Sequence, residues 1–152
     1  MLSREKRFEI EAECKRVALC ASNFADAGRL QEYGDCHTDD AEFIRPSTYP
    51  ANPLKGRAEL VSSLKSRDEN LLSRHVLSNM IVDVINDHEA QAIAYFLHYA
   101  ARRNVDDPEA VPAVDSALKS VGEYQIRFVL QQGKWRIQRR VGRFLFGGVF
   151  KP

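Results

Sequence analysis

Apolar residues in the first part of the chain recur with the spacing of a helix. Between Ser3 and about Phe24 they alternate at intervals of four and three residues, at Ile10, Cys14, Val17, Ala21 and Phe24. This spacing places them on one face of an α-helix, and Ser3 is suited to cap its first turn. Similar patterns predict two shorter helices, over Gly28 to Tyr33 and over Gly56 to Arg67.

The second half has the composition of β-hairpins. Val, Ile, Tyr and Phe are frequent in two pairs of segments, 75–85 with 91–101 and 121–131 with 134–146, and turn-forming residues separate the members of each pair. A brief strand is expected at 41–45, and loops are expected at 47–56 and 102–120. Helices followed by antiparallel strands indicate an α+β fold, which we expect to form one domain over residues 1–152.

Composition narrows the class of protein without naming its chemistry. Hydrophobic residues make up 44% of the chain, and 22 Lys and Arg face 21 Asp and Glu, for a formal net charge of +1. This balance argues against a nucleic-acid binder held by bulk charge. The longest apolar runs are too short for a membrane helix. Three cysteines without CxxC spacing predict neither a zinc site nor a disulfide framework, so we expect a cytoplasmic protein.

Four short motifs, in order along the chain, resemble a known family. They read DAGRL from Asp26, GRAEL from Gly56, RHVLSN from Arg74, and GEY from Gly122 leading into GKWRI. Together they resemble the SnoaL-like branch of the nuclear-transport-factor-2-like superfamily. The resemblance implies a cystatin-like cone, in which a curved antiparallel sheet wraps around about three N-terminal helices and encloses a pocket.

The resemblance also implies candidate site residues. In members such as scytalone dehydratase and hexachlorocyclohexane dehydrochlorinase, an aspartate of the first helix and a strand histidine form an acid–base pair, without a cofactor or metal. By spacing, the histidine position falls on His75 and the aspartate position falls on Asn23, which is uncharged. Phe43, Ser73 and Arg140 match other pocket positions of these members.

The residues themselves support two interpretations of each candidate. His75 opens a predicted strand, where an imidazole can move a proton or simply hydrogen-bond the strand end. Asn23 can orient His75 or be a structural amide, and Arg140 can hold an anionic or carbonyl group or pair with an acid. If an acid lies beside His75 instead, Asp26, Asp83 and Glu123 are the first to examine.

Aromatic residues and two further histidines complete the set of candidates. Tyr95, Phe96 and Tyr124 are expected either to line the pocket or to pack in the core. His98 shares a strand face with Phe96 and is a second candidate pocket imidazole. His37 and His88 fall in polar stretches, where we expect them to be solvated and to bind no metal.

The sequence therefore predicts a dehydratase, isomerase or cyclase acting on a small apolar, oxygen-bearing molecule, with His75 as its acid–base group. A second resemblance, carried by 73–79, 96–102 and 136–141, is to the small subunit of aromatic-ring-hydroxylating dioxygenases. It implies a non-catalytic protein whose partner is a dioxygenase large subunit; a binding protein with a degenerate pocket is a related alternative. The apolar tail 144–150 is expected either to plug the mouth of the pocket or to pack against a second subunit. Together with the aromatic-rich second half, it predicts a homo-oligomer, most simply a dimer.

Overall fold

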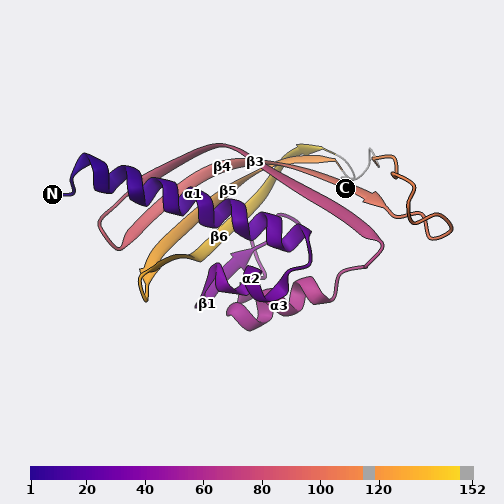
Figure 1. The fold of residues 1–152 in the computed structure, drawn as a ribbon, viewed down its shortest axis with the longest axis horizontal. Helices are drawn as coiled ribbons and strands as arrows, with labels where there is room; N and C mark the ends of the chain where they lie inside the picture. Colours follow the sequence, from indigo (N-terminus) through magenta and orange to yellow (C-terminus); the bar gives the residue numbers. More distant parts are fainter. Residues whose placement is uncertain (115–118, 148–152) are drawn as a thin grey trace.

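A computed structural model of the chain describes residues 1–114 and 119–147. Three helices pack on one face of a curved six-stranded sheet (Figure 1), which confirms the predicted α+β fold. The helices are α1 (Arg4–Asp26), α2 (Leu30–Asp35) and α3 (Arg57–Lys65). The strands are β1 (His37–Ile44), β2 (Leu54–Lys55), β3 (Leu71–Val84), β4 (Glu89–Arg102), β5 (Ser120–Gln131) and β6 (Lys134–Gly147).

Helix α1 lies across the sheet with its small and apolar residues facing inward. The Ser3 side chain accepts a hydrogen bond from the N–H of Lys6 at 3.1 Å, which caps the helix as predicted. Ile10, Cys14, Ala18 and Ala21 are buried against the strands. The helix continues two residues beyond Phe24, so that Asp26 forms its last turn. This extension carries a carboxylate to the end of the helix nearest β3.

The sheet has the order β2-β1-β6-β5-β4-β3, with antiparallel pairs except for β1 and β6, which are parallel. The sheet is therefore antiparallel as expected, with this one parallel pair as the exception. Strand β1 also begins earlier than the predicted 41–45, because its acidic pair Asp39 and Asp40 hides the strand pattern in the sequence. The short strand β2 lies within the predicted loop 47–56 and pairs with β1.

His37 is one residue whose environment was wrongly predicted. It is 1% exposed at the start of β1, and its Nδ1 lies 2.8 Å from the carbonyl oxygen of Tyr33. The polar residues that follow it suggested a solvated turn, but α2 and α3 cover this end of the strand. Burial, with Arg140 and Arg57 nearby, lowers the pKa of His37 to about 3, so its buried ring is neutral.

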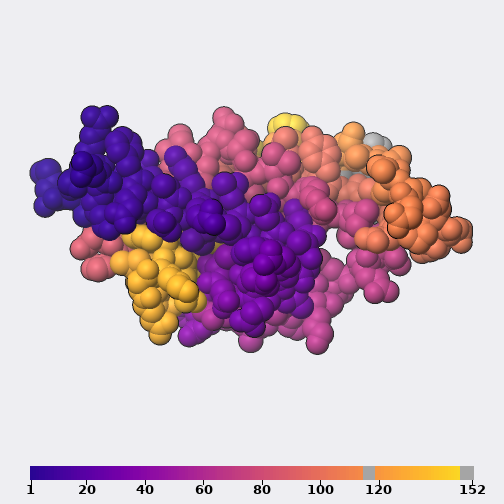
Figure 2. Space-filling model, in the orientation of Figure 1, coloured from indigo at the N-terminus to yellow at the C-terminus, as the bar shows by residue number. Residues whose placement is uncertain are grey.

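Strand alternation and a bulge shape the inner face of the sheet. On β4 the residues Ala90, Ala92, Ala94 and Phe96 are buried. The three alanines are small and leave room for α1 above this part of the sheet. Strand β3 shifts register between Ser78 and Ile81, where Asn79 adopts a positive φ of 50°. Such a bulge bends a strand, and the bend helps the sheet curve around the helices. Figure 2 shows an opening between the purple segment after α1 and the magenta segment containing α3.

Within the described ranges, no helix combines the length and apolarity needed to span a bilayer.

Candidate active site

A cavity of about 570 Å³ lies between the end of α1, the α3 region and the inner face of the sheet. This volume is within the usual range for small-molecule sites. Its apolar wall includes Phe43, Phe96, Tyr124 and Phe144, and its polar wall includes Asp26, Arg67, His75, His98 and Arg140. An apolar wall with a few converging polar groups is typical of a site that both encloses a ligand and orients it.

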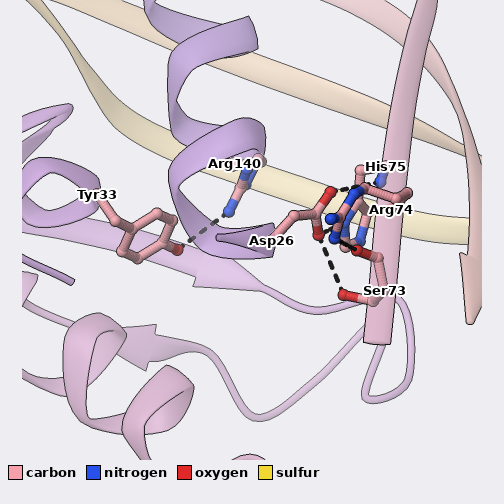
Figure 3. A network of polar contacts seen from close by, with 6 residues as sticks. All are labelled: Asp26, Tyr33, Ser73, Arg74, His75 and Arg140. Atoms are coloured by element: carbon pink, nitrogen blue, oxygen red, sulfur yellow. Dashed lines mark hydrogen bonds and ion pairs between the residues drawn. The ribbon is translucent and has the colours of Figure 1, made fainter. Parts of the chain in front are cut away.

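Asp26 and His75 form a close pair at one side of the cavity (Figure 3). Nδ1 of His75 lies 2.7 Å from Oδ1 of Asp26, and the backbone N–H of His75 donates to Oδ2 at 2.6 Å. The Ser73 hydroxyl donates to Oδ1 at 3.1 Å. The last turn of α1 supplies the carboxylate and the first half of β3 supplies its three donors, so the carboxylate is held in one orientation.

These contacts decide which protons the pair carries. Burial by itself would raise the pKa of Asp26, but the hydrogen bonds and charge of His75, together with Ser73, hold this pKa below its usual value. An ionised Asp26 only accepts hydrogen bonds, so Nδ1 of His75 carries the proton that lies between them. In a neutral ring the lone pair is then on Nε2, which is the arrangement of a general base.

His98 lies beside His75 on the neighbouring strand. The two residues are register partners of β3 and β4, and their ring centroids are 4.6 Å apart. Burial and the neighbouring His75 lower the pKa of His98 to about 4. This ring is therefore neutral near pH 7 and offers one donor and one acceptor to the cavity.

Arg140 supplies a buried positive charge on the cavity wall. The residue is 5% exposed, and its guanidinium lies 4.0 Å from the Phe43 ring centroid and 5.1 Å from that of Tyr124. Its Nη2 donates to the Tyr33 hydroxyl at 3.2 Å (Figure 3). Cation–π contacts of this kind stabilise a guanidinium away from water, and they hold it in a fixed position.

Most of the sequence-predicted site residues meet at this cavity. The residues of that set that line it are Phe43, Ser73, His75, Phe96, His98, Tyr124 and Arg140. Ser73 contacts Asp26 directly, so it positions the carboxylate, a role that spacing did not suggest. Within residues 1–114 and 119–147, no three His, Cys, Asp or Glu side chains are grouped so that they could hold a metal ion.

Asn23 does not join the site. It is exposed and does not line the cavity, because it follows buried Cys14 by nine residues, about two and a half turns, and so lies on the opposite side of α1. Asp26, four residues after buried Ser22, occupies the place expected of Asn23. The assignment of the aspartate position to Asn23 is therefore wrong, and the acid beside His75 is Asp26, the first of the three alternatives.

Tyr95 is also outside the cavity. It lies on β4 between two buried residues, Ala94 and Phe96, and is 45% exposed on the outer face of the sheet. Adjacent residues of a strand point to opposite faces, so Tyr95 and Phe96 cannot both line one pocket.

Sequence reasoning did not identify Tyr33 and Arg67 as cavity residues. Tyr33 lies in α2 and Arg67 follows α3, and no periodicity within either short helix points to a site. Asp26 did carry a detectable signal, because the helical repeat that buries Ala18 and Ser22 leads to position 26 one turn later.

Several solved structures are similar to this chain. A Novosphingobium aromaticivorans protein provisionally named a scytalone dehydratase is 16% identical, with a TM-score of 0.80 over 99% of this chain and 93% of that one. A type 2 hexachlorocyclohexane dehydrochlorinase is 13% identical, with a TM-score of 0.75 over 99% and 98%. A Catenulispora acidiphila protein in complex with S-DNPA is 22% identical, with a TM-score of 0.70 over 90% and 93%.

These identities establish a shared fold, and no curated protein sequence matches the chain. The cone architecture, the enclosed cavity and the predicted motifs agree with the family comparison, in which the SnoaL-like domain matches residues 6–141. The chain belongs to the SnoaL-like domain family.

Proposed function

We propose that the protein is a cofactor-independent acid–base enzyme of the dehydratase, isomerase or cyclase type. Its substrate would be a small, largely apolar molecule that carries an oxygen function, and His75 would move the proton. The observation that carries this proposal is the 2.7 Å contact between His75 Nδ1 and Asp26 Oδ1 at the wall of the cavity.

The chemistry follows from the protonation of the pair. Nε2 of His75 takes a proton from a carbon beside a carbonyl, and the electrons of the broken C–H bond enter the new double bond. In a dehydration, the imidazolium returns the proton to the departing hydroxyl, which leaves as water. In an isomerisation the proton returns to a different carbon. Asp26 stays ionised throughout and stabilises the imidazolium.

Arg140 supports the same proposal from another part of the wall. Removing a proton beside a carbonyl places negative charge on its oxygen, and a fixed positive group stabilises that charge in a water-poor site. Phe96, which stacks on Tyr124 with centroids 4.4 Å apart, adds an apolar surface for the rest of the substrate.

A non-catalytic subunit is the second candidate. The outer face of the sheet exposes Ile93, Tyr95 and Tyr99, which is the kind of surface that a partner chain covers. A subunit of a dioxygenase would co-purify with a larger iron–sulfur chain, whereas an enzyme would purify alone. The Asp26–His75 pair favours the enzyme, because it lies at the cavity wall and leaves Nε2 of a neutral imidazole as a proton acceptor.

Exchange of solvent deuterium into candidate substrates tests the proposal. A panel of small β-hydroxy ketones and cyclic enones is incubated with the protein in D₂O and followed by proton NMR. We expect deuterium uptake beside the carbonyl, slowed about 10²-fold or more by His75→Gln. His88→Gln changes a solvent-exposed turn histidine and is the matched control. Equal uptake with wild type and His75→Gln would refute the role of His75.

A further inference from the structure

We propose that the substrate carries a carboxylate, held at the cavity wall by Arg140 and Arg67. This inference rests on the proposed function and narrows its substrate class, from an oxygen-bearing molecule to an organic acid with an apolar body.

Arg140 is a buried cation that has no acidic partner within residues 1–114 and 119–147. Among the residues that the structure describes, no carboxylate oxygen lies within 4.0 Å of its guanidinium, and its buried Nε has no hydrogen-bond partner. Within the described residues, its guanidinium donates one side-chain hydrogen bond, to the Tyr33 hydroxyl. A buried charge is costly unless it is paired. A ligand anion in the cavity would supply the missing partner.

Arg67 adds a second cation that borders the same space. It lines the cavity beyond the end of α3 and, within 1–114 and 119–147, forms no ion pair. Partial burial lowers the pKa of Arg67. Tyr33, Asp26, Tyr124 and Arg140 also lie near enough to influence this pKa. Arg67 is exposed as a residue, so it can contact both the cavity and water at the mouth.

The acids around the cavity do not neutralise these arginines. Four arginines line it, against three carboxylates. Asp26 is bound to His75, and Asp68 forms an ion pair at 2.8 Å with Arg102, which does not line the cavity. If the histidines are left aside, the lining side chains carry one more positive than negative charge. A ligand with a single negative charge would balance this excess.

The geometry of a guanidinium favours a carboxylate over other anions of one charge. The planar fork of an arginine matches the two oxygens of a carboxylate in a bidentate pair. Proton removal beside a carboxylate would place further negative charge on those same oxygens. Two arginines would then stabilise the transition state more than the bound substrate, which is what catalysis requires.

Matched pairs of acids and amides test the inference by binding alone. Benzoate, cinnamate and 2-naphthoate are titrated against the protein by NMR, beside benzamide, cinnamamide and 2-naphthamide. We expect at least one acid to bind ten or more times more tightly than its amide. Arg67→Gln should weaken the acid about tenfold and leave the amide unchanged, and Arg140→Gln should abolish the preference. Arg127→Gln, which removes an outer-face arginine paired with Glu89, is the control.

The outcomes separate this inference from the proposed function. Equal binding of acids and amides, no binding of any acid at millimolar concentration, or a preference unchanged in Arg67→Gln would overturn it. Because Arg67 is exposed, its variant carries the test even if Arg140→Gln does not fold. His75→Gln should retain the preference for acids while losing deuterium exchange. If the wild-type protein prefers acids but catalyses no deuterium exchange, the result counts against the enzyme and not against the anion site.

Discussion

At the scale of single residues, Asp26 determines what His75 can do. Its carboxylate accepts both the ring N–H and the backbone N–H of His75, so one side chain sets the orientation and the protonated nitrogen of the ring. Asn23, three residues earlier on α1, makes no contact with the site. Substitutions at these two positions can therefore be compared directly, because the Asp26 side chain contacts His75 and the Asn23 side chain does not line the cavity.

We predict that Asp26→Asn lowers the rate of proton transfer by two to four orders of magnitude while the fold is kept. The amide cannot stabilise an imidazolium, and the corresponding change in a serine-protease triad costs about 10⁴ in turnover. Deuterium exchange measures the rate, and circular dichroism checks the fold. Asn23→Asp should leave the rate within about twofold of wild type. A large effect of Asn23→Asp would contradict the placement of the site.

His37 makes stability depend on pH. Its folded pKa is about 3, below the value of 6.5 expected in the unfolded chain. Folding therefore favours the neutral ring, and this stabilisation is complete above pH 6.5 and is lost as pH falls toward 3. At pH 4 the loss is roughly 3 kcal/mol. His98, with a folded pKa of about 4, adds a loss of the same sign.

Urea unfolding at pH 7, 5 and 4 measures this dependence. We predict that His37→Gln is less stable than wild type at pH 7 but loses less stability on acidification. His88→Gln should follow the wild-type curve, because His88 is exposed. If the curves of His37→Gln and wild type run parallel, burial of His37 is not the cause.

At the scale of elements, the cavity wall depends on how closely the Phe96 ring of β4 packs over β5. Gly122 of β5 is the register partner of Phe96 on β4, and a Cβ at position 122 would collide with the Phe96 ring. Glycine here is what allows Phe96 to lie flat against Tyr124. The inner wall of the cavity thus depends on a residue that does not line it.

We predict that Gly122→Ala destabilises the protein by about 1–3 kcal/mol and alters ligand binding, because the Phe96 ring must move. Denaturant unfolding and the carboxylate titrations measure the two effects. Phe96→Leu, combined with Gly122→Ala, should restore part of the stability, since the two residues are in contact. Strict additivity of the two substitutions would show that the collision is not the cause.

At the scale of the whole molecule, the outer face of the sheet carries an apolar surface. Ile81 and Ile93 are register partners there, and Tyr95 and Tyr99 continue the row along β4. Phe144, Leu145 and Phe146, from the tail predicted to form a contact, lie in β6 and are partly exposed. The remainder of that tail, 148–150, lies outside the described residues.

We predict a homodimer formed through this outer face. Exposed apolar rows of this kind usually mark subunit contacts. Sedimentation equilibrium at micromolar concentration should give twice the chain mass, and Ile93→Arg should shift it to the monomer. Arg16→Glu, on the exposed side of α1 and away from the outer face of the sheet, serves as a control for surface charge. A wild-type protein that is monomeric at these concentrations would refute the prediction.

Local patterns in the sequence predicted most of the elements, and the family resemblance predicted most of the cavity wall. Helical spacing from Ile10 to Ala21 and the hairpin composition after position 75 are local signals, because each reflects which side of one element is buried. They were enough to predict an α+β fold, whereas the cone and the choice of His75 and Arg140 came from the family motifs.

Which residues meet is set by the packing of the elements. Asp26 can pair with His75 only because the end of α1 packs against β3, and the burial of His37 depends on helices that cover the start of β1. The parallel pairing of β1 with β6 joins segments about a hundred residues apart. Local patterns record which side of an element is buried, whereas contacts between distant segments depend on how the elements pack.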